Sequence, residues 1–264
     1  MVGVIFSAGL GTRLKPLTDS MPKALVPLAG KPLLQWQVEK LRDAGITDII
    51  VNVHHFPDMI IDAVRANKGW GCNITISDER DLLLDTGGGL KKVKGERLKV
   101  KGDPVLACNV DILSNIVIKD LVRAYEQTGV SQLVVSDRQT QRYLCFDDQN
   151  QLCGWTNIAT GEVKGQDGRH LAFSGMQILS PETLCQLDTM PNEKFSLIDF
   201  YLSIMNKVPL QAFVPSDYRM MDVGKIDEIK KAEQFAALLV SPERLENCDS
   251  NNRQNVVAEN SPRV

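Results

Sequence analysis

The chain has 264 residues, of which 43% are hydrophobic and 24% are charged, and its formal net charge at pH 7 is −3. These values are typical of a soluble globular protein with a sizeable buried core. A weakly acidic chain has no overall attraction for nucleic acid or an anionic membrane, so we expect neither as a partner. The first six residues lack the pattern of a signal peptide and no apolar run reaches transmembrane length, so we expect a cytoplasmic location.

Up to about residue 130, short apolar runs rich in β-forming residues alternate with amphipathic helical patterns. Strands are predicted at residues 2–6, 48–53, 73–78 and 104–111, helices at 32–44, 57–67 and 117–129, and a glycine-rich turn feeding a short helix at 85–93. Strands that alternate with helices along a chain pair in parallel and are covered on both faces. The sequence therefore predicts an α/β fold with a mainly parallel sheet.

After residue 130 the chain becomes richer in strand patterns. Strands are predicted at residues 132–138, 142–148, 151–157, 170–179 and 208–215, turns at 149–151 and 164–169, and helices at 181–187, 196–206 and 225–240. No linker separates this half from the first, so we expect one domain at residues 1–240. Residues 241–264 are polar and aperiodic, and we expect them to form a disordered tail.

A segment rich in glycine, proline and cationic residues, at 7–32, follows the first predicted strand. A glycine-rich turn in this position is where α/β folds bind phosphate. The dinucleotide fingerprint fails because Leu14 replaces its third glycine, and a P-loop fails because Gly30-Lys31 is followed by Pro32. What remains is a loop whose prolines hold its cations for phosphate contacts. A solvated basic loop is the alternative, and it suits Lys15 and Lys31 taken singly.

Two aspartates are candidate ligands for Mg²⁺. Asp111 follows an apolar run, so it is expected at the carboxyl end of a strand, on the same rim as the glycine loop. Asp222 follows the strand predicted at 208–215 after a short loop. Two carboxylates that converge on a phosphate site suit Mg²⁺, which takes few protein oxygens. The alternatives are a turn residue for Asp111 and a helix N-cap for Asp222, and the neighbouring loop favours the metal site.

The cysteines and histidines do not form a recognisable metal-binding motif. The six cysteines contain no CxxC pair, which in a chain of this size favours reduced and mostly buried thiols. The three histidines complete no zinc-ligand spacing. A structural zinc site is therefore not expected.

The opening motif resembles a known family signature. AGLGTRLKPLT followed by PKALVPLAGKP is similar to the N-terminal signature of the sugar-1-phosphate nucleotidyltransferases. DTGGGL (85–90), NVD (109–111), FSGMQILSP (173–181) and DVG (222–224) agree with the family in order, so the resemblance covers about residues 2–237. In detail the chain is similar to the branch that includes N-acetylmuramate-1-phosphate uridylyltransferases and heptose- or mannose-1-phosphate guanylyltransferases.

The resemblance implies a Rossmann-like α/β/α sandwich, with a nucleotide-binding half at about 1–130 and a β-rich sugar-binding half at about 131–240. It implies Mg²⁺-dependent, in-line attack of a sugar 1-phosphate on the α-phosphate of an NTP, giving an NDP-sugar and pyrophosphate. Arg13 would hold the β- and γ-phosphates, and Lys23 would bridge the α-phosphate and the incoming phosphate. The expected nucleotide contacts are Ala8, Gly9, Gly11, Thr12, Arg13, Gly87, Gly88 and Asn109, the sugar-phosphate contacts are Asn157, Glu162, Gly175 and Arg142, and the metal ligands are Asp111 and Asp222.

Several points stay open. Many relatives carry a Glu-Lys-Pro motif whose lysine holds the sugar phosphate, whereas Lys164 stands here in Glu162-Val163-Lys164 without the proline. A non-catalytic nucleotide-sugar sensor is a second hypothesis, disfavoured because all four charged positions are filled. A transferase for phosphocholine is a third, disfavoured because no aromatic cage is evident. The base and the sugar are not specified, and a homodimer is one possible assembly.

Overall fold

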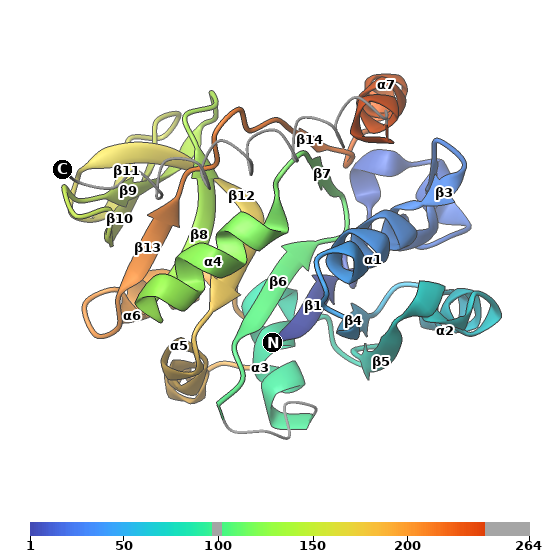
Figure 1. Cartoon of the computed structure of the whole chain (residues 1–264), viewed down its shortest axis with the longest axis horizontal. Helices are drawn as coiled ribbons and strands as arrows, with labels where there is room; N and C mark the ends of the chain where they lie inside the picture. Colours follow the sequence, from blue (N-terminus) through green and yellow to red (C-terminus); the bar gives the residue numbers. More distant parts are fainter. Residues whose placement is uncertain (97–101, 241–264) are drawn as a thin grey trace, which may run out of the picture.

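A mixed sheet runs through the centre of the molecule (Figure 1). A computed structural model describes residues 1–96 and 102–240, and the tail predicted at 241–264 lies outside the described residues. Within these limits, the ten strands of the sheet are β1 (Val2–Phe6), β4 (Asp48–Val53), β5 (Asn73–Asp78), β6 (Val105–Asn109), β8 (Ser131–Ser136), β9 (Arg142–Phe146), β10 (Leu152–Asn157), β11 (Glu162–Gly165), β12 (Arg169–Leu179) and β13 (Leu210–Phe213). Their order is β11-β10-β9-β12-β6-β1-β4-β5, and β8 joins β13 to β12.

Helices cover both faces of the parallel part, which consists of β6, β1, β4 and β5. Successive side chains of a strand point to opposite faces, so Ile5 joins one core cluster while Val4 and Phe6 join the other. The helices on the Ile5 side are α1 (Leu33–Asp43), α2 (Pro57–Ala66), α4 (Ile118–Thr128) and α7 (Ile229–Val240), and those on the other side are α3 (Asp85–Glu96), α5 (Pro181–Cys185) and α6 (Leu197–Ile204). The predicted mainly parallel sheet, covered on both faces, is confirmed.

Helix α1 shows how the sequence pattern becomes packing. Leu34, Val38 and Leu41 recur at helical spacing and are fully buried against the sheet. Each such side chain contributes about 1.5–3 kcal/mol relative to an exposed one. Gly45, with φ of 89°, follows the helix and lets the chain turn back into β4.

Strand β12 connects the parallel part to an antiparallel extension. Its first residues, Arg169–Leu171, pair with β9, and its last residues pair with β6 and β8. The register against β8 shifts between Phe173 and Gln177, and Gly175 has a φ of 69°. Because β12 runs past the end of β6, strands β9, β10 and β11 extend beyond the carboxyl ends of the parallel strands (Figure 1).

Some short elements differ from the sequence prediction. Strand β11 begins at Glu162 and occupies the start of the turn predicted at 164–169. The pair β7 (Ile112–Ser114) and β14 (Met220–Asp222) was not predicted, because two three-residue strands become regular only by pairing with each other. Helix α3 begins at Asp85, so its glycines lie inside the helix rather than before it. In the described residues no helix is long and apolar enough to span a membrane.

Candidate active site

The opening loop is folded into three short 3₁₀ helices, at Thr12–Leu14, Leu17–Asp19 and Lys23–Leu25, followed by the strand pair β2 (Pro27–Leu28) and β3 (Lys31–Pro32). Leu14 and Ala24 are fully buried and anchor the loop to the core. Gly11 has a φ of 64°, and a Cβ there would lie 2.8 Å from Thr18 Cγ2. The Thr18 hydroxyl donates a hydrogen bond of 2.8 Å to the Gly11 carbonyl. The backbone of the loop is therefore anchored to the core, and its cationic side chains project from it.

Lys23 of the opening loop forms an ion pair with Asp111. Lys23 opens the third 3₁₀ helix, and Asp111 lies two residues beyond the end of β6. The Lys23 ammonium donates a hydrogen bond to Asp111 Oδ2, and each side chain is only 13% exposed. Removing one member of so buried a pair leaves the other charge without compensation, at a cost of about 3–5 kcal/mol.

Arg13 and Asp222 form a second, more exposed pair. Arg13 Nη2 lies 3.6 Å from Asp222 Oδ2, and the side chains are 55% and 44% exposed. Asp222 ends β14, whose partner β7 directly follows Asp111. The Val223 amide donates a hydrogen bond of 2.8 Å to the Asp111 carbonyl, which places the two aspartates on adjacent chain segments. Each predicted metal ligand is thus paired with a predicted phosphate-binding cation.

Gly224 gives space to this second pair. Its amide donates a hydrogen bond of 2.7 Å to Asp222 Oδ1. A Cβ at this position would lie 2.8 Å from Arg13 Nη2. The DVG motif therefore combines a carboxylate with the space that lets the arginine reach it.

A pocket of ≈ 370 Å³ lies beside these groups. It is lined by Phe6, Ala8, Gly9, Lys23, Asn52, Leu83, Asp85, Thr86, Asn109, Val110, Asp111 and Lys194. The predicted nucleotide residues Ala8, Gly9 and Asn109 are among them, while Arg13, further along the loop, reaches Asp222. The pocket thus adjoins backbone from the glycine loop and one of the two ion pairs.

Gly87 and Gly88, predicted to approach the base, pack against a loop of the second half. Both amides donate hydrogen bonds to the Phe195 carbonyl, at 2.9 and 3.1 Å. A Cβ on Gly87 would collide with the Phe195 ring, and one on Gly88 with the Glu193 carbonyl. Close packing therefore explains both glycines. The same motif contributes its preceding residues, Asp85 and Thr86, to the pocket.

A buried polar network behind the pocket was missed by the sequence reasoning. The Ser7 amide donates to Asn52 Oδ1 at 2.7 Å, and Asn52 Nδ2 donates to Glu79 Oε1 at 2.8 Å. Glu79 Oε2 accepts from the Leu84 amide at 3.2 Å. Burial raises the pKa of Glu79, although the hydrogen bonds from Asn52 and Leu84 lower it in part.

The network links the ends of three parallel strands to the segment that enters α3. Ser7 follows β1, Asn52 lies near the end of β4, and Glu79 follows β5. A Cβ on Gly89 would lie 2.7 Å from Glu79 Oε1, so the third glycine of the motif makes room for this carboxylate. The available sequence signal was a polar residue at or just after the end of each strand.

Three of the predicted sugar-phosphate residues form a row across the antiparallel extension. Arg142 on β9 is paired with Asn157 on β10, and Asn157 is paired with Glu162 on β11. Arg142 and Glu162 are exposed, whereas Asn157 is buried and its Oδ1 accepts from the Ala159 amide at 3.1 Å. The row lies at the end of the extension that faces the parallel strands.

Gly175 lies between this row and the pocket. A Cβ on Gly175 would lie 2.8 Å from Asn109 Nδ2, so the shift in β12 brings its backbone against the end of β6. Lys164 belongs to the far side of the row: its Nζ lies 3.5 Å from Glu162 Oε1 and 5.2 Å from the centre of the Trp155 ring. The structure thus brings the glycine loop, Asn109 and the row that begins at Arg142 to the carboxyl ends of the parallel strands and the adjoining extension. Gly87 and Gly88 instead pack against the segment at 193–195 and do not line this pocket.

Comparison with known proteins places these features in a family. The profile of the family described as nucleotidyl transferase matches residues 2–237. The chain is 32% identical over 212 residues to the N-acetylmuramate alpha-1-phosphate uridylyltransferase of Caulobacter vibrioides, a match that covers 76% of this chain and 82% of that protein. It is 35% identical over 228 residues to mannose-1-phosphate guanyltransferase 2 of Candida glabrata, covering 85% of this chain and 62% of that protein.

Solved structures agree with the sequence matches. HddC from Yersinia pseudotuberculosis, complexed with GMP-PN, superimposes with a TM-score of 0.69 at 26% identity, over 89% of this chain and 99% of that chain. A UDP-glucose pyrophosphorylase complexed with UDP-glucose gives a TM-score of 0.73 at 17% identity, over 90% and 99%, and supports the fold alone. The chain therefore belongs to the nucleotidyl transferase family, within the sugar-1-phosphate nucleotidyltransferases.

Proposed function

We propose that this chain joins an NTP to a sugar 1-phosphate at the pocket beside Lys23 and Asp111, with Mg²⁺ as its cofactor. A phosphate oxygen of the sugar 1-phosphate forms a bond to the α-phosphorus, the bond to the β-phosphate oxygen breaks, and pyrophosphate leaves. The attacking oxygen is already ionised, so no general base is needed. The observation that carries the proposal is the pairing of two loop cations with two strand-end carboxylates.

The two cations serve different phosphates. Both reactants are anions that repel each other, so positioning and charge neutralisation supply most of the catalysis. Without substrates, Lys23 and Arg13 are neutralised by Asp111 and Asp222. When the substrates bind, phosphate oxygens take the place of the carboxylates as partners: Lys23 holds the α-phosphate and the incoming phosphate, and Arg13 holds the leaving pyrophosphate.

The two aspartates fit a magnesium ion. They lie on adjacent segments and supply carboxylate oxygens only, the donor set that Mg²⁺ prefers, and two protein ligands leave its remaining positions to phosphate and water. When bound, the ion neutralises charge on the phosphates. Asp111 and Asp222 would hold it, which also frees their cationic partners for the substrates.

The remaining assignments follow the two parts of the sheet. For the nucleotide we propose the loop backbone at Ala8, Gly9, Gly11 and Thr12, together with Asn109 and the segment preceding Gly87 and Gly88. For the sugar phosphate we propose the row of Arg142, Asn157 and Glu162. Gly175 has no side chain, so it would let the sugar approach the backbone of β12. Support comes from Ala8, Gly9 and Asn109 lining one pocket and from the alignment of the row across β9, β10 and β11.

A panel of NTPs and sugar 1-phosphates tests the activity by pyrophosphate release, with Mg²⁺ present and then chelated. We expect Asp111→Ala and Lys23→Ala to lose at least about 10²–10³-fold in turnover while the circular dichroism spectrum stays folded. Lys15→Ala is the matched control, because Lys15 lies in the same loop but pairs with Asp19 at 3.0 Å on the surface. Wild-type turnover in both site variants, or full activity after chelation, would contradict the proposal.

Two broader proposals accompany this function. We place the protein in the cytoplasm, which is supported by the free state of all five cysteines in the described part of the chain. We also retain a homodimer as a proposal. Light scattering over a range of protein concentrations tests it, and a monomer mass throughout would reject it.

A further inference from the structure

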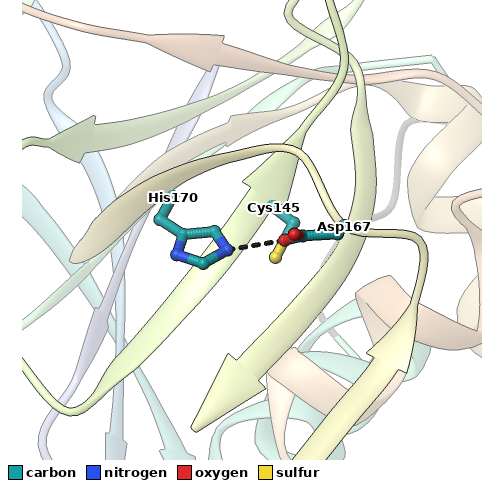
Figure 2. A group of neighbouring side chains, drawn as sticks. All are labelled: Cys145, Asp167 and His170. Atoms are coloured by element: carbon teal, nitrogen blue, oxygen red, sulfur yellow. Dashed lines mark hydrogen bonds and ion pairs between the residues drawn. The ribbon is translucent and has the colours of Figure 1, made fainter. Parts of the chain in front are cut away.

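A group of metal-binding side chains lies on the antiparallel extension, apart from the pocket. Cys145 on β9 and His170 on β12 are direct cross-strand partners. Asp167 stands in the turn before β12, with its Oδ1 2.7 Å from His170 Nε2. Figure 2 shows the three side chains pointing toward one another. One potential ligand atom from each lies within 4.8 Å of the other two, a condition met by no other group of three such residues in the described ranges 1–96 and 102–240.

The donors differ in kind from those of Asp111 and Asp222. A thiolate, an imidazole and a carboxylate form a mixed sulfur, nitrogen and oxygen set, which suits zinc and cobalt ions in tetrahedral coordination. Mg²⁺ prefers oxygen ligands and has little affinity for thiolate. The two sites therefore select different metals, and a zinc-type ion at the extension is distinct from the proposed catalytic cofactor.

The geometry needs only side-chain adjustment to hold such an ion. Two ligands of one tetrahedral zinc lie about 3.4–3.6 Å apart, so His170 Nε2 and Asp167 Oδ1 must separate from 2.7 Å by less than ~1 Å. The ligand atoms all lie within 4.8 Å of one another, so Cys145 Sγ has at most ~1.4 Å to close. Asp167 is 80% exposed and His170 40% exposed at their side chains, so both can move. Cys145 is fully buried and fixed on its strand.

A neighbouring ring helps to orient the histidine. The Tyr143 ring stacks on His170, with the ring centres 5.7 Å apart and the planes at 21°. This stacking limits rotation of the imidazole, while the Asp167 contact to Nε2 is the one that opens when both residues become ligands. The site thus has one rigid ligand and two adjustable ones, and a fourth position is left for solvent.

We propose that Cys145, Asp167 and His170 bind one divalent zinc-type ion, which crosslinks β9 to β12. On binding, a metal–sulfur bond forms and the Cys145 thiol releases its proton to solvent; no oxidation is involved. Arg142 lies on the same strand as Cys145, so the ion would stiffen the strand that carries a proposed sugar-phosphate contact.

Cobalt(II) titration of the full-length protein tests the site, because thiolate ligation gives a charge-transfer band in the near ultraviolet. The background carries Cys248→Ser, which removes the thiol outside the described residues. We expect one cobalt ion per chain and displacement of the band by zinc. Changes to residues that only support a metal ligand cost about 10–100-fold in affinity, so loss of a direct ligand in His170→Ala or Cys145→Ser should cost at least ~100-fold.

Cys153→Ser is the matched control. Its Sγ lies 3.7 Å from the Asp167 carbonyl, so it is a nearby thiol outside the proposed ligand set, and the band should persist. If Cys145→Ser fails to fold, the exposed His170→Ala decides. Absence of the band in the parent protein, its persistence in His170→Ala, or its loss in Cys153→Ser with retention in Cys145→Ser would overturn the proposal. The Asp167–His170 contact would then serve only to hold the turn.

Discussion

At the scale of single residues, three carboxylates at and behind the pocket, Asp111, Asp222 and Glu79, occupy two environments. Asp111 and Asp222 face Lys23 and Arg13 of the opening loop, so their charge is compensated by a cation. Glu79 is almost fully buried, and its carboxylate accepts hydrogen bonds from two neutral donors, Asn52 and the Leu84 amide. It contacts the segment that enters α3, and because burial raises its pKa, we expect stability to depend on pH.

Glu79→Gln tests that dependence. The unfolded carboxyl has its ordinary pKa near 4.5 and burial raises the folded pKa, so the folded protein binds more protons in the window between the two values. Stability therefore falls as pH rises through that window. We expect the wild type to lose free energy of unfolding relative to Glu79→Gln between a pH below 4.5 and neutral pH, measured by chemical denaturation. An identical pH dependence of the two proteins would show that Glu79 does not contribute to the pH dependence of the free energy of unfolding.

At the scale of elements, helix α3 contains glycines in two situations: three pack closely against other segments, and one does not. Gly87, Gly88 and Gly89 let the first turn of the helix pack against the segment at 193–195 and against Glu79. Gly95 lies in the last turn of the same helix, and a Cβ there would meet nothing within 4 Å. The sequence shows four glycines in one segment but does not say which of them pack closely.

The pair Gly88→Ala and Gly95→Ala separates these cases. We expect Gly88→Ala to lower the free energy of unfolding by about 1–3 kcal/mol, because its methyl group would overlap the Glu193 carbonyl. Gly95→Ala should raise it by up to ~1 kcal/mol, since alanine favours the helix and nothing opposes it. Denaturant melts of both variants provide the measurement, and a similar loss in the two would argue against close packing at Gly88.

At the scale of the whole molecule, the proposed site draws on both parts of the sheet. The pocket proposed for the nucleotide lies at the carboxyl ends of the parallel strands, where ligands of open α/β sheets bind. The row beginning at Arg142 lies on the antiparallel extension. Strand β12 connects this extension to the parallel strands, and its register shifts around Gly175. Helix α7 returns to pack against β2 of the opening loop (Figure 1), next to the strand that carries Asp222.

This arrangement predicts that the two substrates can be perturbed separately. Arg142→Ala should raise KM for the sugar 1-phosphate by about 10–100-fold, the value of one or two charge-assisted hydrogen bonds, and leave KM for the NTP nearly unchanged. Arg169→Ala is the control, because Arg169 starts β12 at the outer end of the same extension, opposite Phe146. Steady-state kinetics with each substrate varied gives the answer; equal effects on both KM values would remove Arg142 from the sugar side.

The sequence by itself determined the fold class and the positions of the catalytic candidates. Apolar runs alternating with helical patterns dictate a parallel sheet, because those strands must bury both faces. Glycines and prolines around Arg13 and Lys23 predict a loop that holds cations, and Asp111 follows directly from the end of an apolar run. These features depend on neighbouring residues in the sequence, so they can be predicted from the sequence alone.

Only the tertiary structure decided which distant residues meet. Lys23 pairs with Asp111, and Asp222 is brought beside them by a pairing of two three-residue strands that no local pattern encodes. Cys145 and His170 become neighbours only through the register of β9 against β12, so ligand spacing along the chain gave no zinc motif. The physical reason is common to both cases. Strand register and close backbone packing are fixed by contacts between segments far apart in sequence, and those contacts determine which side chains lie together.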